Sequence, residues 1–242
     1  MKLAAWLAAL GLAGVAAPAV AGPPYQADDP EPTAFGHWEI YSFATADGRA
    51  GDVGGKSGLD LNYGAAKGLQ LTATLPLAFE RRTGSGWSAG RGEVELGAKY
   101  RFVDNEKSGW QAAIFPRIIL PTAAHDLGGT RARFLLPLWL QKDMGKTSMF
   151  GGGGYEINPG DSNRDFWQAA VAVTHDFSDR LQLGTEVAWQ SPDVRGGDGS
   201  TGVDIGMIRK LGGPFALLLV GGPSFSGGHT GYHSYAALAL NF

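Results

Sequence analysis

Charged residues recur at every second position in a stretch that otherwise carries mostly apolar side chains. Between positions 93 and 102, Glu93, Glu95, Lys99 and Arg101 alternate mostly with apolar or aromatic residues. Neighbouring strand residues point to opposite faces, so this spacing puts four charges in line on one face that must contact water. The same parity on later segments places further side chains on that inner face: Arg117, Arg131, Arg133, Trp139, Glu186 and Asp204.

An inner face that carries charges of both signs has two interpretations. The charges can pair into a lattice that fills and stiffens a narrow lumen. They can instead form a constriction, in which case these side chains would contact and select small polar or weakly charged solutes. Other inward positions are apolar, namely Phe115, Ile119 and Leu135, and these suit aromatic or hydrophobic solutes.

Patterns that would support catalysis or metal binding have the wrong context. The stretch 86–90, GWSAG, matches the nucleophile elbow, but it lies in a Gly-rich loop between two predicted strands, whereas the elbow needs a following helix. His229 and His233 have a helical spacing in a segment that reads as loop and strand. The chain has no Cys, which excludes disulfides and thiolate sites. We therefore expect no enzyme activity, catalytic residue, metal or cofactor, and the net charge of −3 argues against nucleic acid as a partner.

The elements that position the inner face are strands long enough to cross a membrane. Residues 69–80 alternate strictly, with Leu69, Leu71, Leu75 and Leu77 on one face. About ten tilted residues span a bilayer, and single-chain barrels have an even strand number. The pattern predicts an all-β, single-chain, antiparallel transmembrane β-barrel over 36–242. Its twelve strands are expected at 36–46, 57–66, 69–80, 93–102, 109–120, 131–142, 147–157, 165–177, 180–190, 202–210, 214–222 and 231–242.

The two ends of the chain indicate where this barrel resides. Residues 1–21 combine a Lys near the start, an apolar core and the small-residue site Ala19-Val20-Ala21, which predicts a cleaved signal peptide. The last predicted strand alternates and stops on Phe242, which resembles the sorting signal of bacterial outer-membrane barrels. We therefore expect the cell outer membrane as the location, with lipid and the outer-membrane assembly machinery, through the Phe242 strand, as partners.

Residues 22–35 are rich in Pro and acidic residues and do not have the pattern of a strand. We interpret them as a disordered periplasmic segment, with a small plug inside the lumen as the alternative. Connections on the expected outer side are predicted to be mostly longer than those on the periplasmic side. Four glycines at 151–154 fall within a predicted strand, where they allow a sharp bend or room for something packed in the lumen.

Several of these stretches together resemble a known family. They are 92–102 (GEVELGAKYRF), Pro121-Thr122, 137–143 (PLWLQKD) and 151–160 (GGGGYEINPG), and the resemblance runs from about residue 36 to the C-terminus. They resemble the outer-membrane proteins grouped under the MetA pathway of phenol degradation, often described as transporters. The family more often has Pro-Thr-Gly where this chain has Pro121-Thr122-Ala123. The resemblance implies an outer-membrane barrel and uptake of aromatic or other small compounds.

Three functional hypotheses follow. The first is passive transport of small molecules, which include aromatic or hydrophobic compounds in one version. The second is a barrel enzyme that acts on lipid or lipopolysaccharide, which would need a Ser–His pair assembled from different strands. The third is a closed structural barrel, because side chains can fill a narrow barrel completely.

Overall fold

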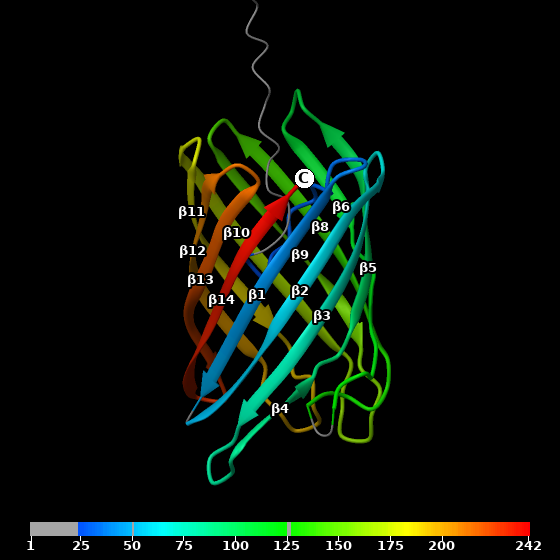
Figure 1. Ribbon diagram of the computed structural model, residues 1–242. Helices are drawn as coiled ribbons and strands as arrows, with labels where there is room; N and C mark the ends of the chain where they lie inside the picture. Colours follow the sequence, from blue (N-terminus) through cyan, green and yellow to red (C-terminus); the bar gives the residue numbers. More distant parts are fainter. Residues whose placement is uncertain (1–23, 50, 125–126) are drawn as a thin grey trace, which may run out of the picture.

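The computed structural model describes residues 24–49, 51–124 and 127–242, so the predicted signal peptide lies outside the described residues. The described chain is a closed antiparallel barrel (Figure 1). Its strands are β1 (Trp38–Arg49), β2 (Asp52–Ala66), β3 (Leu69–Arg81), β4 (Trp87–Arg91), β5 (Glu95–Asn105), β6 (Trp110–Ile114), β7 (Arg117–Ile119), β8 (Arg133–Met144), β9 (Thr147–Ile157), β10 (Phe166–Ser178), β11 (Leu181–Gln190), β12 (Ser200–Gly212), β13 (Phe215–Ser226) and β14 (His229–Asn241). No helix among these residues is long and apolar enough to cross a membrane.

The strands occupy twelve positions around the barrel, as the sequence predicted. β4 and β5 both pair with β3, so they are two parts of one position that is interrupted at 92–94. β6 and β7 both lie between β5 and β8 and are interrupted at Phe115-Pro116. Pro116 has no N–H to donate to the ladder, which explains the second interruption. The predicted strand 109–120 was therefore drawn as continuous where the structure breaks it. The structure also corrects the predicted loop between 80 and 93, because residues 87–91 form β4.

The barrel closes through its first and last strands. β1 pairs with β14 in a register that places Ile40 opposite Leu240. Beyond the last ladder pair, the Trp38 N–H donates to the Phe242 carbonyl at 2.7 Å, and the Phe242 N–H donates to the Trp38 carbonyl at 3.0 Å. Closure therefore leaves neither β1 nor β14 with a free edge that could recruit another chain.

The connections at the two ends of the barrel differ in length. At the end that carries Phe242, every connection is a tight turn, and the longest is 106–109. At the opposite end, three connections are long: 120–132, 158–165 and 191–199. The predicted loops 47–56 and 223–230 are wrong, because strand pairing continues to the turns at 50–51 and 227–228.

Alternation separates an apolar outer face from a polar inner face. On β3 the outward Leu71, Leu75 and Leu77 are 48%, 45% and 58% exposed. The inward Gln70 and Thr72 on the same strand are buried and hydrogen-bonded to Asn62. Large exposed apolar residues recur in this way around the ring, which is the surface expected of a barrel in lipid.

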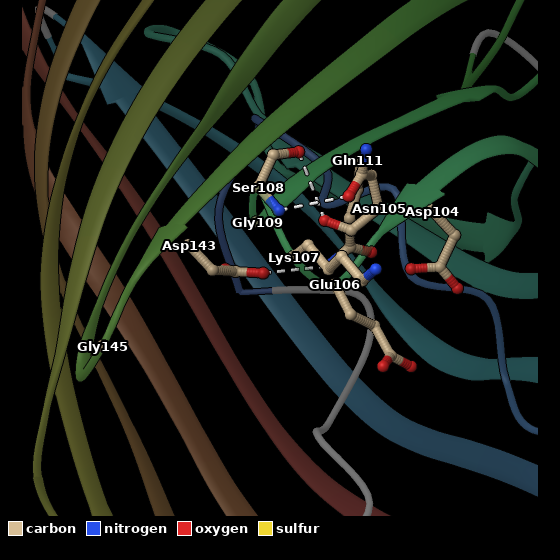
Figure 2. A pocket seen from close by; sticks show the side chains of 9 residues that line it. All are labelled: Asp104, Asn105, Glu106, Lys107, Ser108, Gly109, Gln111, Asp143 and Gly145. Atoms are coloured by element: carbon tan, nitrogen blue, oxygen red, sulfur yellow. Dashed lines mark hydrogen bonds between the residues drawn. The ribbon is translucent and has the colours of Figure 1, made fainter.

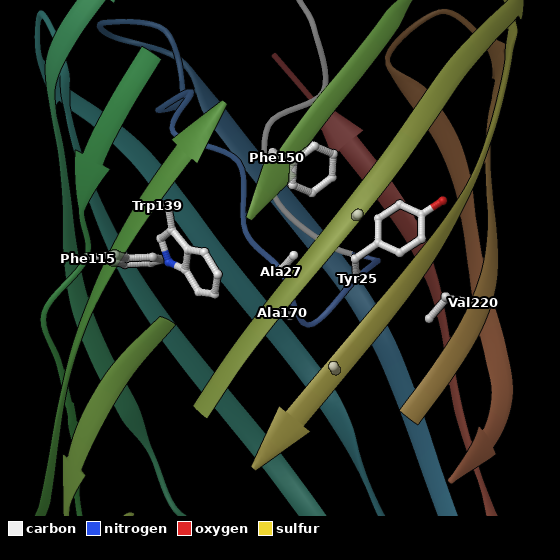
Figure 3. Close-up of a cluster of buried hydrophobic side chains, with 9 residues drawn as sticks. Tyr25, Ala27, Phe115, Trp139, Phe150, Ala170 and Val220 are labelled. Atoms are coloured by element: carbon white, nitrogen blue, oxygen red, sulfur yellow. The ribbon is translucent and has the colours of Figure 1, made fainter. Parts of the chain in front are cut away.

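Residues 24–35 are named the plug from here on; its residues 24–33 lie inside the barrel, whereas Ala34 and Phe35 are exposed (Figures 1 and 3). Pro24, Tyr25, Ala27, Asp28 and Pro30 are buried. The expectation of a disordered segment is therefore wrong for residues 24–35, and the alternative of a lumen plug describes them. Pro and acidic residues argued for disorder in the isolated sequence, but inside the lumen they find apolar and cationic partners.

Candidate lumen site

The plug is held first by a buried ion-pair cluster around Asp28. The Lys99 ammonium contacts the Asp28 carboxylate at 2.8 Å and also donates to the backbone carbonyls of Asp29 and Glu31. Arg117 contacts the other oxygen of Asp28 at 3.2 Å. Lys99 is fully buried, so its charge depends on these plug groups in place of water.

A second anchor lies across the lumen on β11. Glu186 is 1% exposed, and its two carboxylate oxygens accept the backbone N–H groups of Ala27 at 2.5 Å and Gln26 at 3.1 Å. A third contact joins the Thr33 N–H to the side-chain oxygen of Gln70 at 2.8 Å. Side chains of the wall therefore satisfy backbone groups of the plug, which has no strand partners of its own at these positions.

Most of the remaining predicted inward charges form ion pairs along the wall, whereas Asp204, fully buried on β12, has no hydrogen-bond or ion-pair partner on either carboxylate oxygen among the described residues. Arg133 contacts Glu93 at 2.6 Å and Glu156 at 2.8 Å. Glu95 contacts Arg117 at 3.2 Å. These contacts fit the interpretation of a charge lattice, and the lattice includes the plug because Arg117 also binds Asp28.

Two predicted lumen residues have other surroundings. Arg131 is exposed in the loop before β8, because that strand begins at Arg133 and not at 131 as the sequence analysis expected. Its predicted inward position is therefore wrong. Arg101 lies near the Phe242 end, where it pairs with Asp104 at 2.8 Å and donates to Gln111 at 2.8 Å.

Two of the inward apolar residues, Phe115 and Trp139, share a buried cluster with the plug. Trp139, which is 5% exposed, belongs to a buried cluster with Phe115, Phe150, Tyr25 and Ala27 (Figure 3). The ring of Tyr25 meets that of Phe150 edge-on, with 6.0 Å between centroids. These side chains stabilise the plug in place, so the apolar surface of Phe115 and Trp139, which parity predicted for solutes, is covered.

The glycines of β9 provide the space for this cluster. A Cβ built on Gly152 would lie 2.0 Å from the Leu138 carbonyl oxygen and 3.1 Å from the Trp139 ring. The absence of a side chain lets β8 approach closely and leaves room above Gly152 for the indole. The predicted role of the glycines as room for something packed in the lumen fits this arrangement.

Two cavities border the plug from different walls. Cavity A has a volume of about 290 Å³ and is lined by polar side chains of β2, β3, β5, β7 and β10, by Phe115, and by Tyr25, Gln26 and Asp28 of the plug. Cavity B has a volume of about 250 Å³ and is lined by β6 and β8–β12, with Pro24, Tyr25, Asp29 and Glu31 of the plug. Both contact Tyr25, so the plug stands between them.

A recess at the Phe242 end adjoins cavity B. The turn between β5 and β6 surrounds it, and within that turn the Ser108 N–H donates to the Asn105 side chain at 3.1 Å (Figure 2). Gln111 and Asp143 line both this recess and cavity B. This recess, named the turn recess from here on, has a volume of about 400 Å³ and shares these two lining residues with cavity B.

The sequence analysis missed the acidic groups of the plug and the neutral polar network near them. Asp28, Asp29 and Glu31 were assigned to a disordered segment, and no periodicity marks them as lumen residues. Gln111 and Gln141 were also missed, although both lie at inward positions by parity and this signal could have found them.

Groups that would indicate a hydrolase or a metal centre have different partners here. His233 contacts the Asp47 carboxylate at 2.7 Å, and His175 lies 2.8 Å from the Thr147 hydroxyl. Within the described ranges, no group of three or more His, Asp and Glu side chains has the arrangement to hold a metal ion.

Comparisons with known proteins identify the fold. Neither the family models nor the curated proteins include a match to this chain. Among solved structures, the barrel resembles an outer-membrane channel from Pseudomonas putida F1, with a TM-score of 0.71, 12% identity, and coverage of 88% of this chain and 98% of that one. It also resembles the KdgM porin in complex with oligogalacturonate (TM-score 0.58, 10% identity, 84% and 99% coverage) and the CymD monoaromatic hydrocarbon channel (0.50, 7%, 85% and 87%). The chain therefore has the fold of outer-membrane barrels, and membership of the phenol-degradation family stays a prediction.

Proposed function

We propose that this protein is an outer-membrane β-barrel for passive transport of small molecules. The observation that carries the proposal is a lipid-compatible barrel whose polar lumen holds two solute-sized cavities beside a plug. A purely structural barrel has no need of such cavities. The solved barrels that it resembles include proteins described as a channel and as porins, which supports the same proposal.

The orientation follows from the outer-membrane location. The Phe242 end, with its tight turns, faces the periplasm, and the end with the three long loops faces outward. The turn recess then opens to the periplasm, next to cavity B, with the plug between cavity B and cavity A. A solute that crosses must pass the plug, so transport is slow and selective and not that of a wide pore.

Solute flux through the purified protein in liposomes tests this function. Phenol-like aromatics are compared with sugars and amino acids of similar size, and protein-free liposomes give the background. We expect slow, saturable flux of at least one class. Preferential flux of aromatics would support the aromatic version of the proposal. If neither the intact chain nor a chain without the plug passes any solute, the barrel is a closed structural one and the proposal is wrong.

The enzyme alternative has a direct test. A lipid-modifying barrel would release fatty acid or sugar from outer-membrane lipid, and lipid analysis after incubation with the purified protein measures this. We expect no release above that of a heat-denatured sample.

A further inference from the structure

A further cavity lies on the outside of the barrel, at the end that carries the long loops. It has a volume of about 590 Å³ and is bordered by the ends of β9 and β10 and by the connections 158–165 and 191–199. Tyr155 and Trp167 line it, and they are 37% and 58% exposed, whereas their chain neighbours Glu156 and Phe166 are buried on the lumen side. This cavity, named the outer pocket from here on, is therefore open to the surroundings of the barrel and not to its lumen.

Hydrogen bonds tie the two loops of the outer pocket to each other. The Arg164 N–H donates to the Asp193 carbonyl at 2.8 Å, and the Arg195 N–H donates to the Ser162 carbonyl at 2.9 Å. The side-chain amide of Asn158 donates to the carbonyls of Asp193 at 3.1 Å and Arg164 at 3.3 Å. The backbone from which the two arginine side chains project is therefore fixed by contacts between the loops, as a preorganised binding site requires.

Arg164 and Arg195 are the cationic residues in this lining, and both are exposed. Neither guanidinium takes part in an ion pair among the described residues. The acidic residue in the lining, Asp165, is occupied by other donors: its carboxylate accepts the Tyr155 hydroxyl at 3.2 Å and the Asn158 N–H at 2.8 Å. Two guanidinium groups are therefore available to an anion that the protein itself does not supply.

The aromatic rings beside these arginines indicate what kind of anion fits. The rings of Tyr155 and Trp167 lie 4.9 Å apart between centroids and continue the exposed apolar surface of Ile157 and Trp189. Tyr and Trp at the end of an apolar barrel wall mark the level of the lipid headgroups. The planar guanidinium of Arg matches the geometry of phosphate oxygens. Cationic donors directly beside such rings suit a phosphate that is attached to an apolar or sugar portion, and a free phosphate would leave the rings without a contact.

We propose that the outer pocket binds the phosphorylated headgroup of a membrane lipid. Arg164 and Arg195 donate to the phosphate oxygens, and Trp167 contacts the sugar or acyl portion next to the phosphate. Placing this lipid in the outer leaflet rests on the orientation that the proposed function gives the barrel, whereas binding stands on the pocket alone.

The charge of the surrounding loops does not by itself attract anions. Asp161 and Asp193 belong to the same two loops and lie outside the lining of the pocket. These carboxylates offset the two arginines at long range, so a diffuse attraction of anions to this end of the barrel is weak. Recognition therefore depends on direct contact with Arg164 and Arg195, and substitutions at these two positions test it.

Native mass spectrometry on the purified full chain in detergent tests the site with three probes: lipid A, lipid A dephosphorylated by phosphatase, and inorganic phosphate. We expect lipid A to bind about tenfold more tightly than its dephosphorylated form, and inorganic phosphate at the same concentration not to displace it. Arg164→Gln and Arg195→Gln should each weaken binding about fivefold, the effect of an exposed charged contact. Arg131→Gln removes an exposed Arg from another loop at the same end and should bind as the natural chain does.

Three results would overturn the site: equal binding of dephosphorylated lipid A, a loss in Arg131→Gln as large as in the pocket variants, or displacement of lipid A by inorganic phosphate, which would indicate a site for free phosphate. Liposome flux separates this inference from the proposed function. Lipid A binding without flux of any solute leaves the site correct and the channel wrong. Flux without lipid A binding leaves the channel correct and the site wrong.

Discussion

Lys99 is a fully buried ammonium group whose partners belong to the plug. Replacing one partner of a buried pair leaves the other charge uncompensated, which costs about 3–5 kcal/mol. We expect Lys99→Met to cost about 3 kcal/mol of plug docking, the lower end, because Arg117 still contacts Asp28. The measurement is protease cleavage within residues 24–35 together with ion conductance in planar bilayers, and both should rise.

Two further variants control this prediction. Lys107→Met removes a Lys from an exposed turn and should change neither readout. Adding Asp28→Asn to Lys99→Met should recover part of the docking, because the residues are in contact and their effects are not additive. Equal conductance in Lys99→Met and the natural chain would mean that this pair does not hold the plug.

At the residue scale, parity predicted most of the inner face. Glu93, Lys99, Trp139 and Glu186 are buried at the inward positions that alternation assigned. Alternation fails where the strand ends, which is why Arg131 was placed in the lumen although it lies in a loop. Parity also says nothing of partners, and those of Lys99 and Glu186 come from a segment outside the strands.

At the scale of elements, the glycines of β9 make a prediction about strand packing. A side chain at Gly152 would meet the Leu138 carbonyl and the Trp139 ring. We expect Gly152→Val to destabilise the barrel by about 1–3 kcal/mol, the usual cost of overpacking. The temperature at which the folded form disappears on a heat-modifiability gel measures this. Gly86→Ala, where an added Cβ meets nothing within 4 Å, should leave that temperature unchanged.

The plug is the element whose removal has the largest functional consequence. Deleting residues 24–33 removes the groups that bind Lys99, Glu186 and Gln70 and joins cavities A and B. We expect a large increase in bilayer conductance while the barrel still forms, since strand pairing does not involve these residues. Unchanged conductance in a folded deletion variant would show that side chains of the wall close the lumen without the plug.

The plug marks the limit of prediction from sequence at this scale. Strand segments can be recognised in the sequence by alternation over ten or more residues, whereas residues 24–35 have neither alternation nor helical spacing. Their fold depends on contacts with residues as far away as Glu186. Such contacts exist only after the barrel has closed, so local pattern cannot reveal them.

At the scale of the whole molecule, closure depends on the ends of β1 and β14. Trp38 and Phe242 exchange two backbone hydrogen bonds there. If the assembly machinery recognises the Phe242 strand, deleting Phe242 should lower the amount of folded protein in the outer membrane severalfold, whereas Phe242→Tyr keeps the aromatic ring and should be tolerated. Quantifying the heat-modifiable form in membrane fractions checks this. Equal yield from the deletion variant would exclude Phe242 as a sorting element.

The twelve-position ring was predictable because each wall strand repeats the same two-residue period. The interruptions at 92–94 and Phe115-Pro116 were not. At 92–94 the register against β3 shifts by one residue, from Leu77 opposite Arg91 to Thr74 opposite Glu95, so β4 and β5 have opposite inward parity. At Phe115-Pro116 pairing resumes with the inward parity kept. A proline inside an apolar run was the available signal for the second of them.

The two anchors of the plug also have a mechanical consequence. Asp28 binds side chains of β5 and β7, and Ala27 binds a side chain of β11. In the ring of twelve positions, β11 lies five positions from β5 and four positions from β7. The plug therefore crosses the lumen and connects nearly opposite walls of the barrel. A hollow cylinder flattens most easily into an ellipse, and a tie across its bore opposes that deformation. Releasing the plug would thus soften the barrel against lateral pressure from the bilayer as well as open it.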